Sequence, residues 1–436
     1  MALVLGDFLE LSLILIIAAF AIPVSRKLSI IDLPFLVLFG IIFGPVLGVI
    51  SRSFGIYLMT EFGGVGIGIL GIAIILYSES HSINFRIIRR EIIRIASLDS
   101  LGMVITAILA GFFFSLVTGA PLVIGFIFGA IISPTDPASL IPIFRKMEIN
   151  EEVSGILVGE SLFNDPLGII LVAIGISLVD PTSTYIALFS LIQGSLGVLA
   201  TVPVYIVIQI AVPAVFGIVL GFLVINLNKL FGFDNLLVGF LLGIVLLEFT
   251  LLEAVSFTPF PAVIATGAIV GNYSDKSIFY DREANFQQSL SFLLRAIIFI
   301  ILGSILTGAD FTDYFAIGVA AAVLVIFAAR PIAVFISLGV VSRIPSRFKV
   351  TRNVQLFMGL TGPRGVVSVV MSLLPYTIGV TENIPILVQW GMPLYVATSF
   401  VVIISIILQT VYVPYINKKL LNPAVMTRNN GITTNE

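Results

Sequence analysis

Long apolar segments, separated by short clusters of charged and turn residues, run along almost the whole chain. A helix that crosses a bilayer needs about 20 mainly apolar residues. Cutting the chain at its polar clusters gives segments of this kind throughout, and we predict an all-α polytopic membrane protein with about 13 transmembrane helices. The predicted spans are residues 7–25, 31–50, 62–80, 96–118, 121–143, 153–179, 201–228, 235–253, 257–273, 287–308, 313–341, 354–375 and 388–416.

One part of the chain allows two interpretations, and the distribution of basic residues decides between them. The stretch from Tyr185 to Leu227 is long enough for two spans, or for one span preceded by a helix at the membrane interface. With one span, most basic residues fall in loops on a single side, which the positive-inside rule makes the cytoplasmic side. We therefore reject a fourteenth span and predict that the N-terminus is outside and the C-terminus cytoplasmic. The basic residues on the predicted cytoplasmic side are Arg26, Lys27, Arg86, Arg89, Arg90, Arg94, Arg145, Lys146, Lys229, Lys276, Arg282, Arg343, Arg347, Lys349, Arg352, Lys418, Lys419 and Arg428.

The composition agrees with a membrane protein and excludes several other classes. Of the 436 residues, 58% are hydrophobic and 11% are charged, whereas soluble domains carry about 25% charged residues. A net charge of -2 without a basic domain argues against nucleic acid as a partner. The absence of cysteine excludes disulfides, thiolate metal sites and thiol chemistry. We predict a single membrane unit, residues 1–420, followed by a polar cytoplasmic tail, residues 421–436.

The fifth predicted span carries a charge near its centre. Asp136 lies there between Pro134 and Pro137, and a charge at such a depth is costly enough to be a candidate functional group. Two prolines so close together interrupt the helix. An interrupted helix is tolerated at membrane depth where it lines a cavity, and its freed carbonyls can act as ligands. We interpret the segment as part of a cation site; the alternative is a structural kink with a chance aspartate.

The sixth predicted span contains four polar residues in a short window. Glu160 and Asn164 are separated by one helical turn, as are Ser161 and Asp165, so they form two adjacent polar ridges on one side of a helix. Carboxylate and hydroxyl oxygens suit a hard cation. The alternative is an interhelical hydrogen-bond patch, for which serine and asparagine alone would suffice.

The twelfth predicted span is interrupted as well, but around a positive charge. Gly362, Pro363 and Gly365 break the helix on either side of Arg364. Two interrupted helices in separate halves of the chain predict an inverted repeat whose half-helix ends meet near the midplane. Partly positive N-terminal ends would be balanced by a carboxylate such as Asp136, and partly negative C-terminal ends by Arg364. A snorkelling arginine is the alternative, although Arg364 lies far from both ends of its span.

Charged residues near other span ends give weaker signals. Glu248 and Glu253, toward the outer end of the eighth span, are explained as readily by carboxylates facing water as by a functional role. Glu79 and His81, at the inner end of the third span, are interpreted as a solvated interfacial pair. A pH-sensing role stays open for His81, the single histidine. Two arginines within spans have no assigned partner: Arg295 and Arg330.

Three motifs together resemble the NhaP branch of the cation:proton antiporters, which includes the animal sodium/proton exchangers. They are SPTDP at 133–137, GESLFND at 159–165 and GPRG at 362–365, in the family's order on the fifth, sixth and twelfth spans. The resemblance covers essentially the whole chain. It implies thirteen helices, an inverted repeat with two unwound crossing helices, and a homodimer. It also implies a transport core formed by about residues 96–179 and 287–375, with a dimerisation domain formed by about residues 7–80 and 201–273.

The resemblance also implies roles for individual residues. The ion site would comprise Asp136, Asp165, Ser161 and the carbonyl of Thr135. Asn164 beside Asp165 resembles the pair found in electroneutral exchangers, and Glu160 would form an ion pair with Arg364.

Three other positions are compared with the family pattern. Glu253 falls where family members often carry a glutamate before a Gly-Asn step, here Gly271 and Asn272. The third span around Glu79 departs from the family pattern, and so does Arg295, where a small polar residue is commoner.

We therefore expect an antiporter of the cell membrane, not an enzyme, that exchanges Na⁺ or Li⁺ for H⁺ electroneutrally. Asp165, supported by Asp136, would bind either the cation or protons. Only a protein with an occupied site would change the side of the membrane to which the site opens. Its partners would be monovalent cations, protons and lipid, with no redox or nucleotide cofactor, since no phosphate-binding glycine loop is present. The alternatives are a K⁺/H⁺ antiporter, a passive cation channel and an intramembrane aspartyl protease, which also uses two buried aspartates.

Overall fold

The chain folds into helices. The structure, a computed structural model, describes residues 2–28, 32–61, 66–83, 85–136, 140–141, 144, 147, 149–183, 187–233, 236–274, 278–341 and 350–421. Nearly all of these residues are helical, and none of them lies in a strand. The predicted all-α fold class is therefore confirmed.

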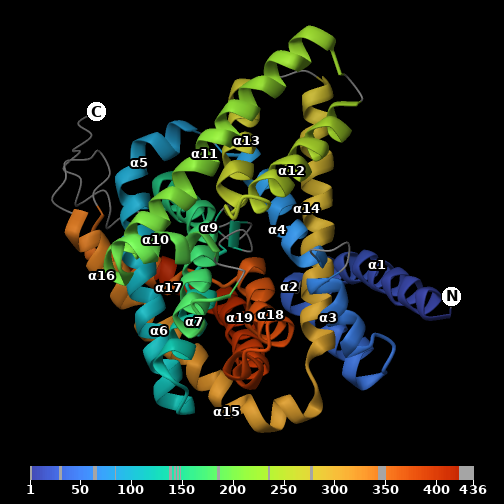
Figure 1. The fold of residues 1–436 in the computed structure, drawn as a ribbon, viewed down its shortest axis with the longest axis vertical. Coiled ribbons are helices and arrows are strands. Elements are labelled where there is room, and N and C mark those ends of the chain that lie inside the picture. Colours follow the sequence, from blue (N-terminus) through green and yellow to red (C-terminus); the bar gives the residue numbers. More distant parts are fainter. Residues whose placement is uncertain are drawn as a thin grey trace.

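The helices follow one another with short connections (Figure 1). In chain order they are α1 (Ala2–Leu28), α2 (Asp32–Ile41), α3 (Arg52–Thr60), α4 (Gly66–His81), α5 (Phe85–Ser97), α6 (Met103–Thr118), α7 (Leu122–Ile132), α9 (Glu151–Val179), α10 (Ala187–Leu196), α11 (Val198–Phe231), α12 (Leu237–Glu253), α13 (Phe260–Tyr273), α14 (Ile278–Ile305), α15 (Gly308–Leu324), α16 (Arg330–Val341), α17 (Arg352–Leu360), α18 (Val366–Thr381) and α19 (Pro385–Leu420). Short π-helical segments continue some of them: η1 (Ile42–Val46), η3 (Leu98–Gly102) and η7 (Val325–Ala329).

Seven helices in the described part of the chain are long and apolar enough to cross a membrane, and shorter apolar helices lie between them. Every predicted span contains a helix of the structure, and the fifth and twelfth are interrupted where proline and glycine predict it. The chain is thus a multi-span helical membrane protein. The count of thirteen spans and the orientation of the termini remain predictions.

Some helices differ from the predicted segments. The charged stretch before residue 96 forms the amphipathic helix α5 and runs through η3 into α6, because a charge cluster ends an apolar segment without ending a helix. Helix α3 was not predicted. The expected short helix before α11 is found as α10. At ten residues it is about 15 Å long, half the thickness of the hydrocarbon core, so it cannot cross.

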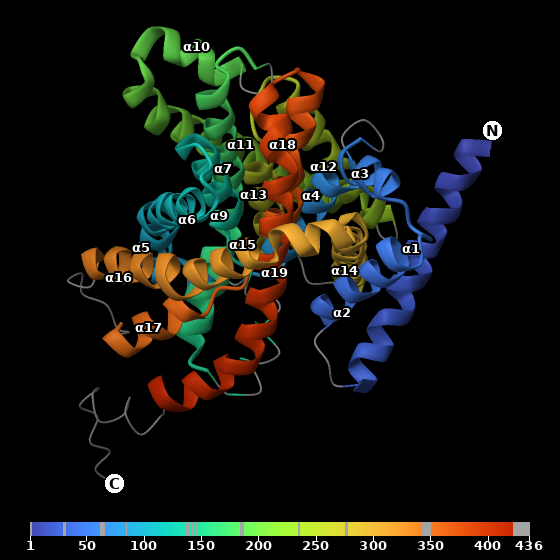
Figure 2. The ribbon, with the colours of Figure 1, turned by 90° about the horizontal axis from the view of Figure 1, so that it is seen from below.

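The helices pack as two groups. In the first, α1 to α4 contact α14, and α10 to α13 join them through α4 and α14; in the second, α5, α6, α7 and α9 pack with α15 to α19. Helix α14 runs along the long axis of the molecule (Figure 1) and contacts both α4 and α2, although most of it falls within the predicted transport core. Figure 2 shows α18 and α19 near the centre of the molecule and α1 at its edge.

Helices α2 and α14 cross at two glycines. A Cβ at Gly40 would lie 2.1 Å from the carbonyl oxygen of Ile300, and one at Gly303 would lie 2.2 Å from that of Val37. Small residues of this kind let helices in a membrane approach to backbone contact. Helix α14 is therefore fitted closely onto α2, and any larger residue at either glycine would push the two helices apart.

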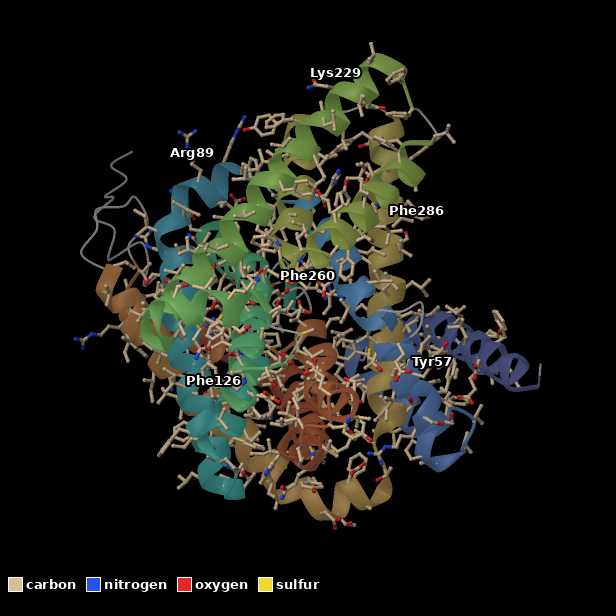
Figure 3. All side chains as sticks on the ribbon, in the orientation of Figure 1. Tyr57, Arg89, Phe126, Lys229, Phe260 and Phe286 are labelled. Atoms are coloured by element: carbon tan, nitrogen blue, oxygen red, sulfur yellow. The ribbon has the colours of Figure 1, made fainter. Side chains whose placement is uncertain are left out.

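Two exposed basic residues project toward one end of the molecule. Arg89 on α5 and Lys229 at the end of α11 are exposed, and they project toward the same end (Figure 3). Both belong to the set of basic residues that the sequence places on one side of the membrane. The common direction of Arg89 and Lys229 is compatible with the prediction that both lie on one side of the membrane.

Candidate functional site

The first interrupted segment follows α7. The helix ends at Ile132, and the residues from Ser133 to Asp136 are not helical. Pro134 has no N–H to continue the helical ladder, while Pro137 lies outside the described residues. The side chain of Asp136 is almost completely buried, with 9% of the residue exposed. The chain therefore brings a carboxylate and a run of free carbonyls into the interior.

The second interrupted segment separates α17 from α18. The residues from Thr361 to Gly365 are not helical and are all buried. Two side chains of helix α19 bind the backbone of this segment. The Gly362 N–H donates to the Gln409 side-chain oxygen at 2.8 Å, and the Arg364 N–H donates to the Ser405 hydroxyl at 3.1 Å. Side chains of a continuous helix thus satisfy backbone groups that Pro363 and the two glycines free.

The two interrupted segments cross and contact each other. The Asp136 N–H donates to the Pro363 carbonyl at 2.7 Å. Arg364 Nη1 donates to the carbonyls of Ser133 at 2.8 Å and Pro134 at 3.1 Å, just beyond the C-terminal end of α7. A Cβ at Gly365 would lie 2.3 Å from that of Asp136, so this carboxylate sits against the N-terminal end of α18. The charges are therefore placed as the helix dipoles require, with the cation at a C-terminal end and the anion at an N-terminal end.

Helix α9 brings its first polar ridge toward these segments. Asn164 Nδ2 donates to the Thr135 hydroxyl at 3.0 Å. Glu160, which is 2% exposed, forms a two-point ion pair with Arg330 on α16, with oxygen–nitrogen distances of 2.5 and 2.8 Å. The predicted pair between Glu160 and Arg364 is therefore wrong. Arg364 is engaged by the carbonyls freed at the end of α7, and packing of α16 supplies a different arginine to Glu160.

The second polar ridge of α9 is buried with the site. Asp165 and Ser161 are 7% and 6% exposed. Asp165 and Asp136 line the same cavity of about 10 Å³, which is the space of about one water molecule or small ion. Glu79, Arg295, Val366 and Val367 also line it. The structure thus brings the two predicted aspartates together at the crossing.

Arg295 on α14 is a member of this site that the sequence left without a partner. Its Nη1 donates to Asp136 Oδ2 at 3.0 Å, and its Nη2 contacts Glu79 Oε1 on α4. Arg295 therefore bridges a carboxylate from each helix group. Its position inside an apolar span was the only sequence signal for such a role.

Glu79 and His81 do not form the solvated pair that we predicted. Residues two apart on a helix point in different directions, so Glu79 faces the site while His81 faces the first turns of α14. His81 is buried, and its Nε2 lies 3.2 Å from Glu283 Oε2. The imidazole also stacks on the Tyr280 ring at a centroid distance of 5.0 Å. The two residues thus belong to separate polar clusters on opposite sides of α4.

The two glutamates of α12 also differ from each other. Glu248 is completely buried and contacts the Thr266 hydroxyl on α13, so it is not a carboxylate facing water. Glu253 is exposed at the end of α12, as expected for a carboxylate facing water, and does not line the cavity. The Gly-Asn step has a packing role: a Cβ at Gly271 would lie 2.0 Å from the His81 carbonyl oxygen, and Asn272 donates to the Ile83 carbonyl.

The site region also contains a buried carboxylate that the sequence pattern does not single out, because it lies near the start of a predicted span. Asp99 is 8% exposed and belongs to η3, a π-helical segment that contacts α9 and α16. Neither of its carboxyl oxygens has a hydrogen-bond partner among the described residues. It lies within electrostatic range of Glu160 and Arg330. Single π-helical turns of this kind occur frequently at functional sites.

The chemistry of the assembled site suits a small cation. It offers carboxylate, hydroxyl and carbonyl oxygens, which are the ligands that hard cations prefer. Three carboxylates, those of Glu79, Asp136 and Asp165, face a single guanidinium, that of Arg295. When all four are ionised the formal charge is negative, so the cavity attracts cations and protons and excludes anions.

A model of the family described as "Sodium/hydrogen exchanger, transmembrane" matches residues 13–419. The chain belongs to the sodium/hydrogen exchanger family. It is 29% identical to Na(+)/H(+) antiporter 1 of Methanocaldococcus jannaschii over 94% of this chain and 95% of that protein. It is 25% identical to Na(+)/H(+) antiporter NhaH of Halobacillus dabanensis over 95% of this chain and 98% of that protein.

Two further relatives of this exchanger family bear on the fold and on the ion. The K(+)/H(+) antiporter NhaP of Alkalimonas amylolytica is 30% identical over 79% of this chain and 55% of that protein. The structure of the sodium proton antiporter MjNhaP1 from Methanocaldococcus jannaschii at pH 8 superimposes with a TM-score of 0.82 at 26% identity. That match covers 97% of this chain and 100% of the other. The family resemblance inferred from the three motifs is confirmed.

Proposed function

We propose that this protein exchanges Na⁺, or Li⁺, for H⁺ across the cell membrane as a secondary antiporter. The observation that carries the proposal is the pair of Asp136 and Asp165, which line one small buried cavity where two interrupted helices cross. Relatives that match nearly the full length of the chain are named Na(+)/H(+) antiporters. The proposal includes no cofactor beyond the transported ions.

Competition for the same carboxylates would make exchange obligatory. Either Na⁺ or a proton cancels one negative charge of Asp136 and Asp165, while the empty site keeps both charges and resists passage through an apolar barrier. Thr135 and Ser161 are buried near these carboxylates and would supply neutral oxygens to Na⁺. The site would then face each side in turn as the second helix group moves against the first. One Na⁺ for one H⁺ makes the cycle electroneutral.

The proposal includes a topology and an oligomeric state. Thirteen spans with an outside N-terminus and a cytoplasmic C-terminus would place most basic residues inside. A homodimer would use the first helix group, where α1 and α11 carry exposed apolar residues such as Phe20, Val215 and Phe222. Cross-linking of the protein in native membranes tests the dimer, and accessibility of single introduced cysteines on either side tests the topology.

Potassium is the second candidate ion, because one relative that matches most of this chain is named a K(+)/H(+) antiporter. The cavity has the volume of about one water molecule, and because a bare K⁺ ion is about as large as a water molecule, this volume does not exclude K⁺. Comparing exchange rates with Na⁺, Li⁺ and K⁺ in the same vesicles decides between the two.

A protease and a channel fit the site less well. An aspartyl protease needs a water held between its two carboxyls, whereas Arg295 binds Asp136 directly here. A channel filter uses rings of carbonyls or charges, whereas this cavity is one asymmetric site within a single chain.

Purified protein in proteoliposomes with an internal pH indicator tests the function. An imposed Na⁺ gradient should drive protons in the opposite direction, and Asp165→Asn, which removes the charge but keeps the shape, should abolish this movement. Arg89→Gln, on the exposed surface of α5, is the matched control and should transport normally. Sodium flux without counter-movement of protons would indicate a channel, and normal exchange by Asp165→Asn would contradict the assignment. Strong dependence of the final gradient on a clamped membrane potential would contradict electroneutrality.

A further inference from the structure

Arg295 already occupies part of the space where a cation would be bound. Its guanidinium lines the cavity together with Asp136 and Asp165, and it donates to Asp136 Oδ2 at 3.0 Å while contacting Glu79. The side chain is 11% exposed. A buried guanidinium held between two carboxylates supplies the same neutralising charge that an inorganic cation would supply.

The two carboxylates bound by Arg295 come from different helix groups. Glu79 is on α4, which packs with α14 in the first group, and Asp136 follows α7, which packs with α6 and α9 in the second. Arg295 is itself on α14, a helix fitted onto α2 by backbone contact at Gly40 and Gly303. Its bond to Glu79 therefore lies within the first group, whereas its bond to Asp136 joins the two groups.

We propose that Arg295 is a tethered competitor of the transported cation, which holds Asp136 against the first helix group until Na⁺ displaces it. The proposal rests on the proposed exchange function and adds a residue that sets the apparent affinity for the ion. Because Arg295 is anchored to α14 it cannot travel with Asp136, so movement of the second group must break this bond. An incoming Na⁺ between Asp136 and Asp165 replaces the positive charge of the Arg295 guanidinium. In an empty site no cation replaces that charge.

The competition predicts a separation of affinity from maximal rate. Arg295→Gln removes the competing charge, so Na⁺ should bind about tenfold more tightly, seen as a lower apparent KM. The maximal rate should stay within about threefold of that of the wild type. The variant lacks the bond between Arg295 and Asp136 that movement must break, and it adds no new bond that would slow the movement. Arg295→Lys keeps a positive charge at the site and should leave the apparent KM within about threefold of the wild-type value.

A second variant separates charge from folding. Glu79→Gln/Arg295→Gln replaces an oppositely charged pair by two amides, so the formal charge of the site stays as in the wild type. If Arg295→Gln alone fails to fold because two carboxylates lose their partner, the double variant keeps the comparison possible. Without Arg295 to displace, its apparent KM for Na⁺ should still lie below that of the wild type, by a smaller factor than in the single variant.

The measurement has two independent readouts. The first is the apparent KM and maximal rate of Na⁺-driven proton movement in proteoliposomes at alkaline pH, where protons compete least. The second is the shift in melting temperature that NaCl, compared with choline chloride, produces in detergent, which reports binding without transport. The shift should be larger for Arg295→Gln, and for the double variant, than for the wild type at the same NaCl concentration.

The outcomes separate this inference from the proposed function. An unchanged or raised apparent KM in Arg295→Gln and in the double variant, with no larger Na⁺-dependent shift, would overturn the competitor role and leave the bridge a structural one. Absence of exchange by the wild type in every cation would overturn the proposed function instead. In that case the melting shifts would still decide whether Arg295 and Na⁺ compete for one site.

Discussion

Glu160 on α9 and Arg330 on α16 form a two-point ion pair in the interior, with 2% and 3% of the two residues exposed. Each partner leaves a buried charge uncompensated if the other is removed, whereas removing both leaves none. The pair therefore holds α16 against α9, the helix that carries Asp165. It fixes the relative position of the two helices and also neutralises two buried charges.

Removing one partner of this pair should destabilise the protein strongly. Glu160→Gln and Arg330→Gln should each cost about 3–5 kcal/mol, and the double variant should cost less than the sum. Melting curves in detergent measure the losses, with Arg89→Gln as a surface control. A double-mutant cycle should give a larger coupling for Glu160 with Arg330 than with Arg364. The reverse order would restore the pairing suggested by the family resemblance.

The crossing of the two interrupted segments should not tolerate a methyl group at residue 365. In Gly365→Ala the new Cβ would lie 2.3 Å from the Asp136 Cβ, so the carboxylate or the backbone must shift. We expect a loss of most Na⁺-driven proton movement and a stability cost of about 1–3 kcal/mol.

Gly239→Ala is the matched control for that substitution. It lies within α12, where a Cβ would meet nothing within 4 Å, and should transport normally. Normal transport by Gly365→Ala would show that the two segments are farther apart in the working protein.

The hydrogen bond from Asn164 to Thr135 should govern ion binding by holding the first interrupted segment on α9. Thr135→Val removes the acceptor while keeping the shape, so the apparent KM for Na⁺ should rise, while Thr135→Ser should behave nearly as the wild type. Coupling of Thr135→Val with Asn164→Ala should amount to about 0.5–3 kcal/mol in a double-mutant cycle of Na⁺ binding. Strict additivity would mean that the bond does not position the segment.

The buried contact between His81 and Glu283 should stabilise the junction of α4 with α14. Glu283 is completely buried, so His81→Leu would remove the imidazole that lies 3.2 Å from its carboxylate and should cost about 1–3 kcal/mol. Adding Glu283→Gln to this variant should recover part of the loss, which melting curves can measure. If the double variant is no more stable than the single one, Glu283 has other partners that matter more.

Much of the fold follows from the order of apolar segments, because backbone groups in lipid must be paired within helices. Pro134 and the glycines at 362 and 365 also reveal both interruptions, since each residue acts on its own backbone. Which charges meet is a different matter. Whether Glu160 meets Arg330 or Arg364 depends on the rotation of α16 and α9 about their axes. Apolar patterns that extend around the whole helix do not specify this rotation.

The same reason explains the other residues that were misplaced. Glu79 and Glu248 lie close to predicted span ends, where water is the default partner of a carboxylate. Only the packing of α14 and α13 shows that Glu79 is half-buried and Glu248 completely buried. Asp99 sits in a π-helical turn whose extra residue changes the face on which later side chains lie. Sequence spacing alone assumes a regular helix and cannot place it.

The glycine crossing of α2 and α14 determines which part of the protein supplies the fixed frame. A shift of α14 by one turn would bring Phe299 to the place of Gly303, where there is no room for even a single methyl group. Helices α2 and α14 must therefore move as one piece or not at all, and Arg295 is carried on that piece. Any change in the distance from Arg295 to Asp136 then reports movement of the interrupted segments relative to α2 and α14. This distance therefore measures how far the ion site moves during transport.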